Sequence, residues 1–106
     1  MPEQLLFEVD TPLGFRVRCT SAYWDYIVDR KHPVLSGREK EIERVLREPV
    51  EVRRSRKDEK VLLFYREDAG LWICAVVRRQ DGSGFLITAY RTDAVKAGDI
   101  VWKRFV

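Results

Sequence analysis

The stretch VEVRRSRKDEKVLLFYREDAGLWICAVVRRQDGSGFLITAYRTD, residues 50–93, decides the fold of this 106-residue chain. Its apolar and polar side chains alternate with a period of two, which is typical of β-strands. The connections RKDEK, DAG and DGSG are short enough for antiparallel hairpins. The middle runs are almost continuously apolar, as expected for central strands that helices cover. The sequence therefore predicts a four-stranded antiparallel sheet made of VEVRRS, VLLFYRE, LWICAVVRR and FLITAYRT.

Two helices are predicted directly before this sheet. A Thr or Ser at positions 20–21 caps the first helix, which stops near His32 because Pro33 disfavours helical geometry in the residue before it. Ser36 and Glu39 have the S-x-x-E spacing of a capping box, which predicts the start of the second helix.

A β-hairpin is predicted ahead of the helices. Residues 6–19 alternate in polarity on both sides of a TPLG turn, and Arg16 and Arg18 are expected to face outward. At the other end, the tail DAVKAGDIVWKRF is expected to hold a short helical turn and then a Trp-bearing segment that packs over the sheet. The predicted class is α+β in one domain, 1–106, with an N-terminal hairpin (1–19), two helices (20–49), and the antiparallel sheet with its C-terminal segment (50–106).

Composition limits the classes of function only weakly. A hydrophobic fraction of 45% predicts a folded core, and a net charge of +3 permits a nucleic-acid partner without requiring one. Cys19 and Cys74 lack the spacing of a metal site, so neither a metal nor a cofactor is expected. The first residues, MPEQLLFEVD, do not have the pattern of a signal peptide, and no apolar run of about 18 residues is present. We therefore expect a cytoplasmic protein without a membrane span. The aromatic residues are expected in the core more than on a base-stacking surface; they include Trp24, Tyr26, Phe64, Tyr65 and Trp72.

His32 is the single histidine and the first candidate for chemistry. An imidazole titrates near neutrality and suits general acid–base catalysis. Its place at a helix C-terminus, with Asp29 three residues earlier, is expected to favour the charged form. The alternative is a helix-end histidine that lies in solvent or bonds a terminal carbonyl.

Arginines on the predicted strands form the second candidate group. Arg53 and Ser55 share one face of their strand, whereas Arg54 projects from the other. Two or three guanidinium groups on one face would make an anion site, because each holds a phosphate through paired donors. A strand arginine is also commonly a solvated covering residue, and that alternative remains open. The candidates of this kind are Arg53, Arg54, Ser55, Arg66 and Arg91.

The third candidate feature is the run LITAYRTD, residues 86–93. Strict alternation places Leu86, Thr88 and Tyr90 on one face, with the two hydroxyl-bearing residues about 7 Å apart. These hydroxyls would hold phosphate oxygens or orient a histidine, although Thr and Tyr also favour strands for packing reasons alone.

The absence of several catalytic motifs reduces the number of reaction types to consider. The chain has no glycine-rich phosphate loop, no G-x-S-x-G and no paired-carboxylate signature. A nuclease without metal must deprotonate a nucleophile and stabilise the phosphorane with side chains. Only RNA supplies an internal 2′-OH nucleophile, so metal-free chemistry would act on RNA.

Four short motifs occur together and in order: RKHPVL, VRRS, LLFYRE and FLITAYRTD. Between about residues 24 and 103 the chain thereby resembles the phage-associated and cyanobacterial members of the barnase–EndoU–colicin–RelE (BECR) nuclease superfamily. The resemblance implies two helices on a four-stranded antiparallel sheet and a metal-independent endoribonuclease activity. The N-terminal hairpin would be an addition to that core.

The resemblance also implies roles for particular residues. His32 matches the helix-end histidine that acts as general acid or base. The R-R-S motif falls on Arg53, Arg54 and Ser55, the second-strand motif on Tyr65 and Arg66, and the last-strand motif on Thr88 and Tyr90. Arg54, with Arg66 or Arg53, would then supply the phosphate cations, and Arg91 would add a phosphate contact.

Two other readings stay open. One is a non-catalytic module that binds RNA, the ribosome or a protein through the same basic face. The other is an interaction protein that forms a homodimer through the N-terminal hairpin or a sheet edge, and an inhibitor protein is a further partner to consider. Catalysis requires His32 near Thr88 or Tyr90, with two arginines around one cavity.

Overall fold

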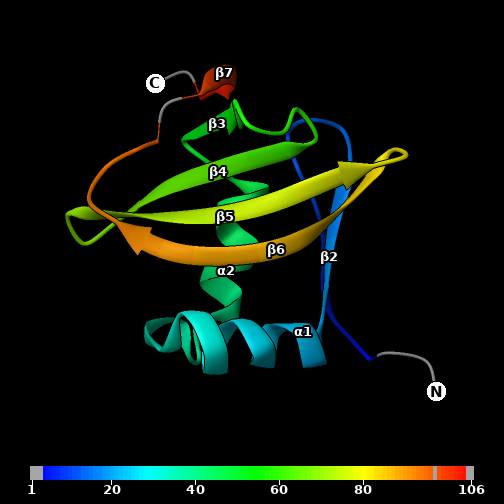
Figure 1. The fold of residues 1–106 in the computed structure, drawn as a ribbon, viewed down its shortest axis with the longest axis vertical. Helices are drawn as coiled ribbons and strands as arrows, with labels where there is room; N and C mark the ends of the chain where they lie inside the picture. The colour runs from blue at the N-terminus through cyan, green and yellow to red at the C-terminus, as the bar shows by residue number, and fades with distance from the viewer. Residues whose placement is uncertain (1–3, 97, 105–106) are drawn as a thin grey trace.

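The computed structural model describes residues 4–96 and 98–104, which form a seven-stranded mixed sheet with helices behind one face and along one edge (Figure 1). The α+β class, with hairpin, helices and then antiparallel strands, is confirmed. The strands are β1 (Leu5–Asp10), β2 (Arg16–Thr20), β3 (Glu51–Arg54), β4 (Val61–Asp68), β5 (Leu71–Gln80), β6 (Ser83–Thr92) and β7 (Asp99–Lys103), in the spatial order β1-β2-β6-β5-β4-β3-β7. The helical segments are α1 (Ser21–Tyr26), the π-helical turn η1 (Ile27–Lys31), the 3₁₀ turn η2 (Pro33–Leu35) and α2 (Glu39–Arg47).

The four predicted antiparallel strands form the centre of the sheet, from β3 to β6. One face of this part is buried against α2, which passes behind the strands in Figure 1. We call this the helix face. The apolar stripe of α2 is fully buried and consists of Ile42, Val45 and Leu46. The strand residues in the same core cluster include Val52, Leu62, Phe64, Ile73, Ala75, Val77 and Ala89.

The N-terminal hairpin is confirmed, with β1 antiparallel to β2 and an N–H to carbonyl bond of 3.3 Å from Gly14 to Thr11 across the turn. Arg16 and Arg18 are exposed, as predicted. The hairpin also joins the central sheet, because β2 pairs in parallel with β6 at Val17–Gly84 and Arg18–Phe85.

A glycine permits the parallel pairing of β2 with β6. A Cβ on Gly84 would lie 2.8 Å from Cε2 of Phe15 and 3.0 Å from Cγ1 of Val77. Gly84 therefore lets the hairpin approach the central sheet. The sequence pattern predicted neither this pairing nor the resulting mixed sheet.

The helical region differs from the prediction in two ways. Thr20 caps α1 by accepting a hydrogen bond from the Tyr23 N–H at 3.2 Å, but the helix then widens into the π-helical turn η1. The predicted capping box is wrong, since α2 starts at Glu39 and its N-cap is Arg38, without a side-chain cap bond. The Glu39 carboxylate instead accepts a hydrogen bond from Trp24 Nε1 at 2.9 Å, which ties α2 to α1.

The C-terminal segment also corrects the prediction. Residues 93–96 contain no helical turn, and the Trp-bearing segment extends the sheet as β7, antiparallel to β3, instead of packing over it. A Cβ on Gly98 would lie 2.6 Å from the Arg54 carbonyl oxygen, so this position requires the close backbone approach that glycine allows. The predicted hairpin and tail segments also include residues 1–3, 97 and 105–106, which lie outside the described residues.

Within residues 4–96 and 98–104, no helix is long and apolar enough to cross a membrane. Both cysteines are buried free thiols.

Candidate functional site: the open face of the sheet

The face of β3 to β6 opposite α2 carries the candidate site, and we call it the open face. The strand register aligns Tyr65, Cys74 and Tyr90 in one row across β4, β5 and β6. A neighbouring row contains Arg53 and Thr88 at its two ends, with Leu63 and Val76 between them. The alternation of the strands thus places Tyr65, Thr88, Tyr90 and Arg53 on the same face.

The segment that follows β6 covers part of this row. Val95 packs against the small apolar cluster of Leu63, Tyr65 and Cys74. The Lys96 N–H donates a hydrogen bond to the Tyr65 hydroxyl at 3.0 Å, and the Lys96 ammonium lies 5.2 Å from the centre of the Tyr90 ring. A cation over an aromatic ring is attracted by its electron-rich face.

His32 reaches the open face from the sheet edge beside β6, where α1 and η1 lie in Figure 1. Its ring centre is 5.8 Å from that of Tyr90, with 38° between the two planes. The backbone holds the residue there, since the His32 N–H donates to the Ile27 carbonyl at 2.8 Å and the following proline favours its extended φ of −141°. We call His32, Tyr65, Cys74, Tyr90 and Lys96 the His32–Tyr90 site.

Burial controls the protonation of the site. Partial burial, together with the positive charge of Lys31, lowers the pKa of His32 below its usual value of 6.5. The expectation that the helix end and Asp29 favour a charged imidazole is therefore wrong. Burial also raises the pKa of Cys74 to about 11 and raises that of Tyr90 well above its usual 10, so both groups are protonated at neutral pH.

Two polar atoms on the open face lack hydrogen-bond partners. The Thr88 and Tyr90 hydroxyl oxygens are buried, and neither makes a hydrogen bond within the described part of the chain. The Tyr90 hydroxyl faces the Cys74 and Tyr65 groups, whose proximity adds to the rise in its pKa. Buried polar atoms usually have a hydrogen-bond partner, so these two hydroxyl groups are exceptions on the open face.

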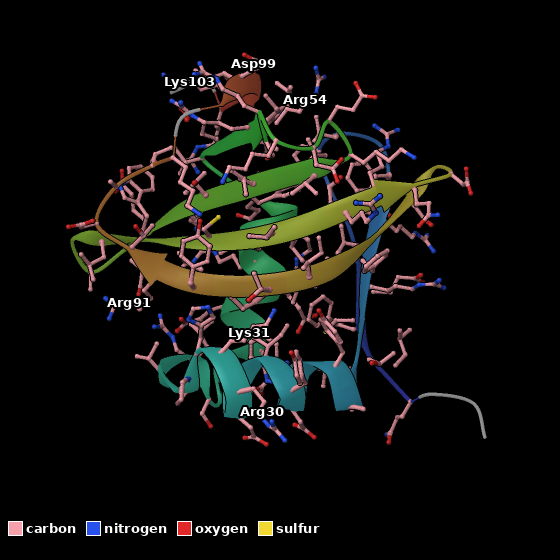
Figure 2. The ribbon with its side chains drawn as sticks, viewed as in Figure 1. Arg30, Lys31, Arg54, Arg91, Asp99 and Lys103 are labelled. Atoms are coloured by element: carbon pink, nitrogen blue, oxygen red, sulfur yellow. The ribbon has the colours of Figure 1, made fainter. Side chains whose placement is uncertain are left out.

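The arginines do not gather around His32. Arg54 and Arg66 pair across strands with Leu62 and Ile73, and therefore lie on the helix face as the alternation predicted. Figure 2 shows Arg54 beside β7, at the opposite edge of the sheet from Lys31. Arg66 donates to the Glu48 carbonyl at 2.5 Å.

Arg91 and Ser55 also lie away from the site. Arg91 is on the helix face, and its Nε is 2.8 Å from an Asp68 carboxylate oxygen, an ion pair without the alignment of a hydrogen bond. Ser55 lies in the turn after β3, where its hydroxyl accepts a bond from the Lys57 N–H at 3.2 Å. Among the predicted arginines, Arg53 alone shares the open face, and its Nη1 donates to the Lys96 carbonyl at a long 3.5 Å.

An irregularity in β6 corrects the predicted facing of one residue. Thr88 pairs with Val76 and Leu86 pairs with Val77, so Ile87 is an extra residue, a β-bulge. Leu86 is consequently buried in the core of the helix face, on the side opposite Thr88 and Tyr90. The predicted pair of hydroxyl-bearing residues on one face is nevertheless confirmed.

Lys96 is the member of the site that the sequence analysis missed. It lies in a connection without periodicity, and its contact with Tyr90 depends on how that connection crosses the sheet. Cys74 was considered only as a possible metal ligand. Within the described residues, no group of three or more His, Cys, Asp or Glu side chains is placed to hold a metal ion.

Comparison of the chain with protein-family models, with curated proteins and with solved structures found no match.

Proposed function

We propose that this protein is a metal-independent endoribonuclease and that His32 is its catalytic base. The observation that carries the proposal is the contact of a partly exposed imidazole, with a lowered pKa, with Tyr90 on the open face. Both residues lie in motifs on which the resemblance to a ribonuclease superfamily rests. A neutral imidazole at neutral pH is the form that accepts a proton.

The proposed reaction needs one general base, His32, and the 2′-OH of the RNA as its nucleophile. His32 accepts the proton of a ribose 2′-OH, and the 2′ oxygen forms a bond to the adjacent phosphorus. The bond from phosphorus to the 5′ oxygen of the next nucleotide breaks, and that oxygen takes a proton from solvent. The products are a 2′,3′-cyclic phosphate and a 5′-hydroxyl, and no metal or cofactor takes part.

Charge on the phosphorane needs a nearby cation. Lys96 is the best placed, since its ammonium is exposed and lies over the Tyr90 ring that His32 also contacts. Lys31, next to His32, faces the sheet (Figure 2) and adds positive charge. Lys96 thus takes the role for which Arg54 and Arg66 were expected, while Thr88 and Tyr90 shape the surface on which His32 lies.

The acid limb of the pH–rate profile tests this assignment. Because burial lowers the pKa of His32, the active neutral form persists as the pH falls past 6.5. We expect cleavage of a fluorescent structured RNA in EDTA to decline only through a pKa below 6.5. An acid limb above 6.5, or no cleavage at any pH, would contradict the proposal.

The alternative is a module that binds RNA without cutting it. Three of the expected phosphate-binding arginines, Arg54, Arg66 and Arg91, lie on the helix face, so the pair of arginines expected beside a catalytic His32 is not assembled there. A module that binds RNA without cutting it needs cations but no base. Fluorescence anisotropy distinguishes the two functions, since such a module binds RNA that remains intact over long incubation.

The proposal extends to location and partners. Cleavage of cellular RNA would take place in the cytoplasm, and an inhibitor protein would act by covering the His32–Tyr90 site. The outer strands β1 and β7 end the sheet at its two edges, where a second copy of the chain or an inhibitor could add a strand.

A further inference from the structure

A second concave surface lies apart from the His32–Tyr90 site, where β2, α1 and the beginning of β6 meet. This cavity has a volume of about 440 Å³, within the range of small-molecule sites. Its lining combines aromatic rings with one cation at the rim, and includes Arg18, Cys19, Tyr23, Tyr26, Phe85 and Leu86. We call it the aromatic cavity.

The rings of this cavity are exposed and held in place. Tyr26 is 46% exposed and Phe85 is 39% exposed, so both rings are accessible from solvent. The Tyr23 hydroxyl donates to the Ile87 carbonyl at 2.7 Å, which fixes its ring 5.7 Å from that of Tyr26. The expectation that Tyr26 belongs to the core is therefore wrong.

Two cations lie beside the rings. Arg18 is exposed at the rim, and the Lys31 ammonium lies 5.5 Å from the centre of the Tyr26 ring. Figure 2 shows Lys31 on the side of the helical segment that faces the sheet, and Arg30 on the side away from it. Exposed aromatic rings beside cations are the features with which proteins hold single-stranded nucleic acid, by stacking bases and pairing with phosphates.

Strand β6 connects this cavity to the His32–Tyr90 site. Phe85 lines the cavity and Tyr90 contacts His32, and the five residues from one to the other span about 17 Å of strand. Both sites border the same edge of β6, along which α1 and η1 run (Figure 1). One extended strand of RNA along this edge would reach both.

We propose that the aromatic cavity is a nucleobase subsite, in which a base of single-stranded RNA stacks on Tyr26 and Phe85 while Arg18 binds a phosphate. The inference rests on RNA being the substrate of the proposed function. It adds a requirement for an unpaired base on one side of the scissile bond. The His32–Tyr90 site alone does not impose this requirement.

The test measures binding of a short fluorescent single-stranded RNA by anisotropy, with every protein carrying His32→Gln so that the RNA remains intact. We expect Tyr26→Ala to weaken binding by about fivefold to a hundredfold, the usual loss for one stacked base, and Phe85→Ala to act in the same direction. Tyr26→Phe keeps the ring and should bind like the parent. Val34→Ala is the matched control, because Val34 is 57% exposed and does not line the cavity.

An RNA of abasic nucleotides distinguishes the contribution of base stacking to the affinity from the contribution of the phosphate charges. On this RNA, Tyr26→Ala should bind no more weakly than the parent, because the stacking partner is gone. The inference is overturned if Tyr26→Ala binds normal RNA as tightly as Val34→Ala does, or if it weakens both RNAs equally. It is also overturned if sedimentation shows a dimer that Tyr26→Ala dissociates, since the cavity would then hold a second copy.

Failure of this inference and failure of the proposed function give different results. If binding depends on Tyr26 but the native protein never cleaves RNA, the subsite stands and the ribonuclease proposal fails. If the native protein cleaves RNA and Tyr26→Ala binds it normally, the ribonuclease proposal stands and the subsite fails.

Discussion

Replacement of His32 by glutamine is expected to lower the rate of RNA cleavage by about 10²- to 10⁴-fold, the usual contribution of a general base. Glutamine has a polar side chain of similar reach but accepts no proton near neutral pH. Binding of the RNA should change little, because the neutral imidazole contributes no charge. The measurement is single-turnover cleavage in EDTA, with the RNA affinity of both proteins measured in parallel.

The control for this experiment is Val34→Ala, close to His32 in the chain and exposed. It should retain the native rate. Equal rates for native protein and His32→Gln would remove His32 from the mechanism. A loss of RNA affinity as large as the loss of rate would assign the residue to binding instead.

Replacement of Phe64 by alanine is expected to cost about 3–5 kcal/mol of unfolding free energy. Phe64 is fully buried at the centre of β4. Its ring meets that of Phe15 edge-on, with centres 6.5 Å apart, so it links the central sheet to the N-terminal hairpin. Truncation would leave a cavity under both parts of the fold.

Urea unfolding followed by tryptophan fluorescence measures this cost. Ile100→Ala is the matched control, because Ile100 is 51% exposed on β7 and its truncation should cost under about 0.5 kcal/mol. Similar costs for the two variants would contradict the assignment of Phe64 to the core.

The sequence predicted those features of the site that depend on local geometry. Alternation along the strands correctly assigned Arg53 and Arg54 to opposite faces, and Pro33 correctly predicted that the helical segment stops near His32. Alternation assigned Leu86 to the wrong face, because the bulge at Ile87 shifts the period by one residue. The residue types around the bulge do not indicate this shift.

Features that depend on distant contacts were not predictable from periodicity. The parallel pairing of β2 with β6 and the addition of β7 at β3 join segments far apart in the chain. The lowered pKa of His32 arises from burial, whereas the sequence pattern showed only its helix end and Asp29. The position of Lys96 over Tyr90 depends in the same way on the path of an irregular connection.

The most direct test of the central claim compares two RNAs in EDTA, identical except for one linkage. The first is all ribose, and the second carries a 2′-deoxy sugar at the bond that the native protein cuts. The account predicts cleavage of the first RNA to a 2′,3′-cyclic phosphate and a 5′-hydroxyl, no cleavage at the deoxy linkage, and loss of activity in His32→Gln prepared in the same way. Intact RNA in every reaction, or a cut at the deoxy linkage, would contradict it.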